Sequence, residues 1–187
     1  HPNGVIVAWL GQSGYLVCHA GYRFILDPYL SDSLTRKYAE TKKPHERISR
    51  LVSAPERLTG ISFVTSSHNH TDHLDGETLA KLIDANPGVR LIVPRANSTF
   101  ALDRLVSAGV TNAATYPVDV PVHETLTLSE IHGCTITAVP AAHEALDTDE
   151  NGDYRYHGYC ITISGQTIYH SGDCVPYDGL AAAVLPY

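Results

Sequence analysis

Short apolar runs separated by glycines dominate the start of the chain. Segments 5–10, 15–18 and 23–26 are rich in β-branched, aromatic and aliphatic residues. The glycines between them are typical of turns that join antiparallel strands. Residues 31–59, in contrast, are charged, interrupted by proline and without a continuous apolar face. We predict antiparallel strands first, and then a surface insertion over 31–59 with one or two short helices.

Helical periodicity follows further along the chain. Leu79, Leu82 and Ile83 lie at helical spacing, and Asn-Pro-Gly ends that helix at residue 88. A second amphipathic helix is predicted over 98–110, and the last residues, 177–187, have the pattern of a helix that is beginning.

Strands are predicted between and after these helices. Their apolar segments are 60–68, 90–94, 124–128, 134–143, 156–163 and 166–173. The chain has no internal repeat. A mixture of strands and helices of this kind predicts an α/β (α+β) fold in which helices cover sheets. We expect residues 1–187 to form one domain.

The composition narrows the class of protein. Of 187 residues, 43% are hydrophobic and 18% are charged, as in globular proteins. A net charge of -7 argues against sequence-independent binding of nucleic acid. No apolar run approaches the roughly 18 residues of a membrane span, and the first residues do not resemble a signal peptide. Four cysteines without a CxxC pair favour free thiols, and therefore a cytoplasmic location.

One stretch concentrates metal-binding side chains between a predicted strand and a predicted helix. It places His68, His70, Asp72 and His73 within six positions. Residues two apart in an extended segment point the same way, so His68 and His70 can converge on one ion. Asp72 and His73 can then face a second ion beside it. Imidazole and carboxylate together suit zinc, manganese or iron, so this stretch predicts half of a metal site.

Further ligands are expected at the ends of other strands. A catalytic metal usually takes three protein ligands, and one loop does not supply enough. His143 and Asp173 each follow an apolar strand and are the predicted partners. Asp27 has two interpretations: a carboxylate that orients a metal-bound histidine from behind, or a turn residue before Pro28. His170, inside an apolar strand, is predicted to be a core histidine.

These motifs together resemble a known superfamily. The stretch SHNHTDHLD, the later His143 and the stretch YHSGD are similar in order and context to the metallo-β-lactamase superfamily. Within it, the opening WLGQSGYLV…FILDPYLSD resembles the L-ascorbate-6-phosphate lactonase group. The resemblance implies an αββα four-layer sandwich that holds two divalent metal ions, Zn²⁺ or Mn²⁺, along one edge.

The resemblance also implies which residue binds which ion. His68, His70 and His143 would hold one ion, Asp72 and His73 would hold the other, and Asp173 would bridge the two. The superfamily pattern includes one more histidine late in the chain. No histidine follows Asp173 in this sequence, so we expect the domain to be incomplete at its C-terminus.

The implied activity is hydrolysis of a small molecule. Two ions about 3.5–4 Å apart can lower the pKa of a shared water towards neutrality, and Asp72 would be catalytic by orienting that nucleophile. The subgroup resemblance favours a lactone of a phosphorylated sugar acid as substrate. A phosphodiesterase similar to phospholipase D is the alternative. Two others are a non-catalytic metal-binding module and a di-iron redox protein, which would need an extra carboxylate near Asp75 or Glu144. A homo-oligomer is the default expectation.

Overall fold

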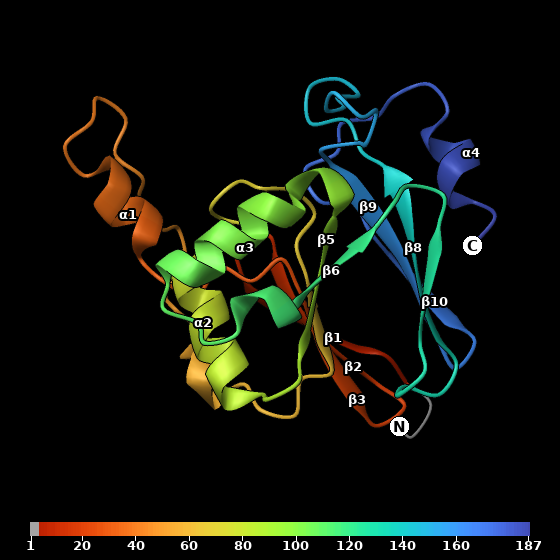
Figure 1. The fold of residues 1–187 in the computed structure, drawn as a ribbon, viewed down its shortest axis with the longest axis horizontal. Coiled ribbons are helices and arrows are strands. Elements are labelled where there is room, and N and C mark those ends of the chain that lie inside the picture. Colours follow the sequence, from red (N-terminus) through yellow and green to blue (C-terminus); the bar gives the residue numbers. More distant parts are fainter. Residues whose placement is uncertain (1–3) are drawn as a thin grey trace.

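The computed structural model describes residues 4–187, and two β-sheets form its centre (Figure 1). The first sheet has the order β1-β2-β3-β4-β5-β6. Its strands β1 to β3 are antiparallel, whereas β3 to β6 run parallel to one another. The bounds are β1 (Ile6–Gly11), β2 (Gly14–His19), β3 (Tyr22–Leu26), β4 (Phe63–Thr65), β5 (Arg90–Pro94) and β6 (Pro117–Val120).

The second sheet is antiparallel throughout and has the order β10-β9-β8-β7. Hairpin strands of four to seven residues, rich in apolar and β-branched side chains, build it, as expected for a sheet with one covered face. The bounds are β7 (Thr125–Leu128), β8 (Cys134–Pro140), β9 (His157–Ile163) and β10 (Gln166–His170).

Helices flank the two sheets. Figure 1 shows α2 and α3 over the outer face of the first sheet, α4 beyond the second sheet, and α1 projecting at one end. The order is therefore helices, sheet, sheet, helix. The bounds are α1 (Ser33–Tyr38), α2 (Gly76–Ala85), α3 (Ser98–Ser107) and α4 (Leu180–Val184), with 3₁₀ turns η1 (Pro55–Arg57), η2 (Arg95–Asn97) and η3 (Ala113–Thr115).

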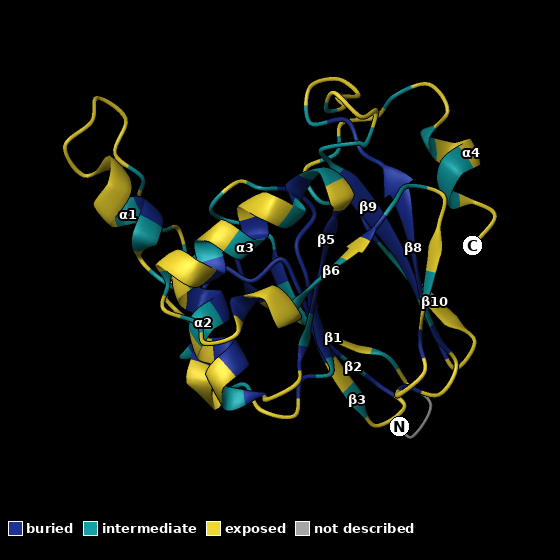
Figure 2. Cartoon of the chain, viewed as in Figure 1, coloured by how far each residue is buried: buried dark blue, intermediate teal, exposed yellow. Residues whose placement is uncertain are grey.

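Two apolar cores hold these layers together. One lies between α2, α3 and the first sheet and contains Leu79, Leu82 and Leu105. The other lies between the sheets, where the rings of Phe24 and Phe63 stack 4.6 Å apart. Figure 2 shows the resulting pattern, with buried strands in the middle and exposed outer helix faces. Burial of these apolar side chains is the main driving force that packs the layers together. This packing fixes the position of the sheet edge on which the site is built.

The predicted mixed α/β fold with two sheets is confirmed. The amphipathic helices occur as α2 and α3, with Leu79, Leu82 and Ile83 buried as the periodicity required. Strand β6 was not predicted, because it has only four residues and begins with proline. Residues 31–59 contain α1 and the η1 turn. The described residues include no helix long and apolar enough to cross a membrane.

Candidate metal centre

The predicted ligands meet at one edge of the two sheets because each follows the end of a strand. His68 and His70 lie in the loop after β4, while His143 and Asp173 each lie three residues beyond β8 and β10. One ligand atom from each of these four residues lies within 4.8 Å of the other three. The structure thus brings together residues separated by as many as 105 positions of sequence, in the grouping that a metal ion requires.

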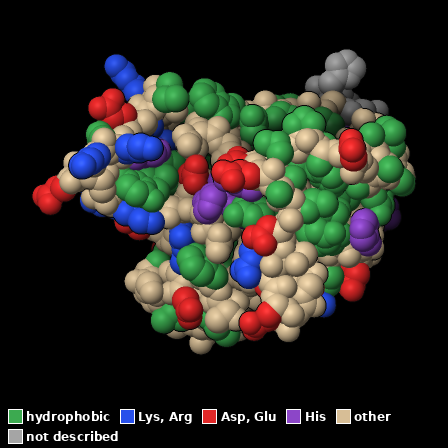
Figure 3. Space-filling model, turned by 90° about the horizontal axis from the view of Figure 1, so that it is seen from above, with side chains coloured by type: hydrophobic (Ala, Val, Ile, Leu, Met, Phe, Trp, Pro, Cys, Tyr) green, Lys and Arg blue, Asp and Glu red, His purple; other side chains and the backbone are tan. Residues whose placement is uncertain are grey.

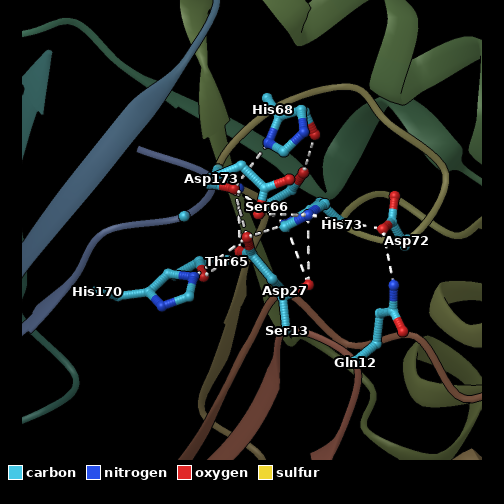
Figure 4. A network of polar contacts seen from close by, with 12 residues as sticks. Gln12, Ser13, Asp27, Thr65, Ser66, His68, Asp72, His73, His170 and Asp173 are labelled. Atoms are coloured by element: carbon cyan, nitrogen blue, oxygen red, sulfur yellow. Dashed lines mark hydrogen bonds and ion pairs between the residues drawn. The ribbon is translucent and has the colours of Figure 1, made fainter. Parts of the chain in front are cut away.

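Asp72 and His73 form a second group beside the first. The Nε2 atom of His73 lies 3.3 Å from Asp173 Oδ1 and 3.9 Å from Asp72 Oδ2. The other oxygen of Asp173 lies 3.8 Å from His143 Nε2, so this carboxylate faces both groups. Gln12 Nε2 donates to Asp72 Oδ2 at 3.2 Å and steadies it (Figure 4). All six residues predicted as metal ligands therefore lie at one place.

Asp27 lies directly behind this centre and is fully buried. It adopts a left-handed backbone conformation with φ 41°, which carries a local cost. His73 Nδ1 lies 2.7 Å from its Oδ2, and His170 Nε2 lies 3.1 Å from the same oxygen. Thr65 Oγ1, Ser67 N and Ser67 Oγ also donate to this carboxylate (Figure 4).

The charge of Asp27 is stabilised by these contacts. Burial alone would raise the pKa of the Asp27 carboxyl, but His170 and His73 hold it well below its usual range. Of the two interpretations of Asp27, the structure agrees with a carboxylate that orients a site histidine from behind. His170 is buried, as predicted, and faces Asp27 rather than the metal-binding groups.

The ionisation of the histidines suits metal binding. Burial lowers the pKa of His68 to about 3, and burial together with His143 lowers the pKa of His70. Both rings are therefore neutral at pH 7, the form that binds a metal ion. Within residues 4–187 the buried Nε2 atom of His68 has no hydrogen-bond partner. An orphaned ring nitrogen beside two more histidines and a carboxylate fits a divalent transition metal.

The pKa of His73 is shifted in the opposite direction in the metal-free chain. Burial alone would lower its pKa, but hydrogen bonds with Asp173 and Asp27 raise the pKa to about 10. The ring is then a proton-carrying link between the two carboxylates. A metal ion that binds Nε2 would take the place of that proton, which is the usual coupling between metal binding and proton release.

Gly172 allows the segment that carries Asp173 to approach the loop after β4. Its φ is +55°, and an added Cβ would lie 2.6 Å from both Cβ and Oγ of Ser67. Any side chain would therefore push Asp173 away from the histidines, or push Ser67 away from Asp27.

Arg104, on α3, fixes the loop that carries the histidine cluster. Its Nη1 donates to the carbonyl of Leu74 at 2.5 Å, and its Nη2 donates to the carbonyl of Asn69 at 3.1 Å. These carbonyls lie on either side of His70, Asp72 and His73. The guanidinium also lies over the ring of Phe100, 4.8 Å from its centroid. One planar side chain thus holds both ends of the ligand-bearing turn.

We expect Arg104→Gln to weaken metal binding about tenfold, because two charge-assisted hydrogen bonds to the loop are lost. Equilibrium competition with a chromogenic chelator measures this affinity directly. The matched control is Arg95→Gln, which removes an exposed arginine paired with Asp119 on the molecular surface. Equal metal affinity in the two variants would contradict a role of Arg104 in holding the loop.

Sequence reasoning missed several residues of this region. Ser67 donates to Asp27, and the ring of Tyr156 lies 5.1 Å from those of His68 and His143. Ser67 directly precedes His68, and Gln12 belongs to the opening motif, so local sequence offered a signal for both. Tyr156 and Arg104 offered none, because folding alone brings them to the site.

The di-iron alternative would need an extra carboxylate ligand near Asp75 or Glu144. Asp75 is buried and caps α2 through Thr78 N, and it also accepts a hydrogen bond from Ser33 Oγ. The Asp75 carboxylate therefore has a structural role. Glu144 lies at an exposed pocket beside His143.

A two-sheet α/β fold in which three histidines and an aspartate converge at one sheet edge is typical of one class of metal-binding proteins. The family described as "Beta-lactamase superfamily domain" matches residues 22–185. The chain belongs to this family, the metallo-β-lactamase superfamily.

Comparisons with individual proteins agree with this family. The chain is 25% identical over 91% of its length to N-acyl-phosphatidylethanolamine-hydrolyzing phospholipase D 1 of Caenorhabditis elegans, and covers 47% of that protein. It is 30% identical over 88% of its length to the mitochondrial N-acyl-phosphatidylethanolamine-hydrolyzing phospholipase D of Saccharomyces cerevisiae, and covers 33% of it. The chain thus spans about a third to a half of these relatives.

Among solved structures, the fold is similar to that of Igni18, described as a novel metallo hydrolase from Ignicoccus hospitalis. The TM-score is 0.58 at 18% identity, over 94% of this chain and 63% of the other. At this identity the similarity concerns the fold alone.

Proposed function

We propose that this chain is a metal-dependent hydrolase that binds two divalent ions, Zn²⁺ or Mn²⁺. The observation that carries the proposal is the convergence of His68, His70, His143 and Asp173 within 4.8 Å, with His73 3.3 Å from the same aspartate. His68, His70 and His143 would hold the first ion, and Asp72 and His73 the second. Asp173 would contact both ions.

The chain's own side chains have distinct tasks in this proposal. Divalent ions held there would supply Lewis-acid activation of water and of the substrate oxygen. Asp72, steadied by Gln12, accepts a hydrogen bond from the attacking water and so orients it. Asp27 fixes the ring of His73 through Nδ1, which leaves Nε2 directed at the site. No serine or cysteine nucleophile is needed.

The substrate is an ester of a small molecule, attacked at a phosphoryl or a carboxyl centre. The names of the two phospholipase D relatives support a phosphodiester as the first class to test. A lactone of a phosphorylated sugar acid, suggested by the opening motif, is the second class. A non-catalytic module with one ion and a di-iron redox protein remain as outcomes of the test below.

The proposal is tested by metal content and turnover on the same purified protein. We expect close to two equivalents of zinc or manganese per chain by elemental mass spectrometry. We also expect hydrolysis of bis(4-nitrophenyl) phosphate or of a sugar lactone that is abolished by a chelator and restored by metal. One equivalent without turnover would point to a binding module, and two irons would point to redox chemistry. Either result would overturn the proposal.

A further inference from the structure

We infer that the pocket between α1 and the histidine loop binds a phosphate group of the substrate at a point separate from the bond that is cleaved. This inference rests on the proposed function, because it extends the same site. The pocket has a volume of about 450 Å³, a size that suits a small phosphorylated molecule. Its lining includes His70 and Asp72, so it opens directly on the metal-binding groups.

Nitrogen-bearing side chains that can donate a hydrogen bond to a phosphate also line this pocket. They include Lys37, His45 and Arg104. Arg104 contributes positive charge, but two of its donors are already bonded to the carbonyls of Leu74 and Asn69. Lys37 is the available donor: the neighbouring ion pairs are Arg36 with Glu77 and Arg47 with Asp32, and among residues 4–187 no carboxylate pairs with Lys37. His45 Nδ1 is buried without a hydrogen-bond partner in the same described part of the chain.

The charge distribution of the chain supports this assignment. The whole chain carries a formal charge of -7, yet residues 36–50 contain six of its thirteen lysines and arginines and only two acidic residues. Figure 3 shows Lys and Arg side chains gathered at the left of the molecule, over the α1 end, beside His and acidic side chains near its centre. A basic segment beside a reaction centre on an acidic protein attracts anionic substrates and orients them.

The other two pockets at the site are lined by no lysine or arginine. One is lined by Glu144 and Asp147 together with His70 and His143. The other is lined by Asp72 and Asp173, with Trp9 and Ile48 at its apolar side. Two carboxylates line each of these pockets, whereas Asp72 is the one carboxylate that lines the pocket of Lys37. Because carboxylates repel a phosphate, an anionic substrate is favoured with its phosphate towards Lys37 and its uncharged part on the opposite side.

The test is binding of a phosphorylated probe to metal-loaded protein by isothermal titration calorimetry. Glucose 6-phosphate is the soluble probe, glucose is its uncharged match, and phosphatidylcholine vesicles containing phosphatidic acid are the lipid probe. We expect Lys37→Gln to weaken binding of a phosphorylated probe about tenfold, the effect of one charge-assisted hydrogen bond. Lys43→Gln is the matched control, because it removes the same charge from the same segment but Lys43 does not line the pocket.

Each outcome of these titrations either supports or overturns the inference. Selective loss in Lys37→Gln supports it, and the probe that shows the loss identifies a soluble phosphate ester or a lipid headgroup as its source. Equal binding by Lys37→Gln and Lys43→Gln, or by glucose and glucose 6-phosphate, overturns it. Lys37 is on an exposed helix, so an unchanged melting temperature is expected and separates lost binding from lost folding. Hydrolysis of bis(4-nitrophenyl) phosphate by the wild-type protein tests the proposed function independently of this pocket.

Discussion

Replacement of His70 by alanine is expected to abolish hydrolysis while the protein stays folded. His70 is one of the four residues whose ligand atoms lie within 4.8 Å of one another, and it is exposed rather than part of either core. Its loss leaves the first ion with two imidazoles and one carboxylate. We expect kcat/KM to fall about a thousandfold or more, which corresponds to roughly 4 kcal/mol of transition-state stabilisation. Steady-state kinetics on whichever ester is turned over measures this effect.

Metal content and thermal unfolding complete this experiment. The variant should retain about one tightly bound equivalent fewer than the wild type. Its metal-free form should melt within about 2 °C of the metal-free wild type, as is usual for substitutions of exposed residues. His132→Ala is the control, since His132 is an exposed histidine of the same chain distant in sequence from the cluster. A His70→Ala protein that is metal-free but hydrolyses at the wild-type rate would exclude the proposed mechanism.

The histidine cluster could be predicted because its ligand residues lie close together in the sequence. His68, His70, Asp72 and His73 lie within six positions, so their spacing alone indicates a metal site. His143 and Asp173 were reached by a weaker argument, that polar residues after apolar strands gather at one sheet edge. That argument depends only on strand ends, which hydrophobic runs reveal well.

Contacts between residues far apart in the chain could not be predicted from the sequence. The pairing of Asp27 with His73 joins residues 46 positions apart, and Arg104 reaches Asn69 across 35 positions. Both contacts depend on how sheets and helices pack, which no local pattern encodes. The segment 31–59 illustrates the same limit. Its charges predicted an exposed surface, but α1 carries Lys37 to a pocket that also contains His70.

Replacement of Asp27 by alanine is expected to produce the largest loss of stability of any change at the site. The carboxylate is fully buried and contacts His73, His170, Thr65 and Ser67. Removal leaves these groups without their shared acceptor, and a buried positive imidazole without its counter-ion. Breaking a buried pair in this way costs about 3–5 kcal/mol. Urea unfolding of the chelator-treated protein measures the change.

The control for this substitution is Asp84→Ala, which removes an exposed carboxylate on α2. It should change the unfolding free energy by less than about 0.5 kcal/mol, as is usual at surfaces. Asp27→Asn keeps an acceptor for Ser67 and Thr65 but loses the charge, so its stability should lie between those of Asp27→Ala and the wild type. If Asp27→Ala were as stable as Asp84→Ala, the buried network would have no energetic role.

The pH dependence of stability separates the charge of Asp27 from simple packing. Because its folded-state pKa is depressed, Asp27 stabilises the metal-free protein above the ordinary value of 3.8, and this contribution is lost as the pH falls below it. His73 has a raised pKa of about 10, so its contribution is complete below 6.5 and is lost as the pH rises from 6.5 towards 10. The stability difference between wild type and Asp27→Ala should therefore be greatest between these limits, from about pH 4 to 6.5. A difference that does not vary with pH would mean that Asp27 acts by filling space, and that His73 owes its orientation to Ser13 and Ser67 instead.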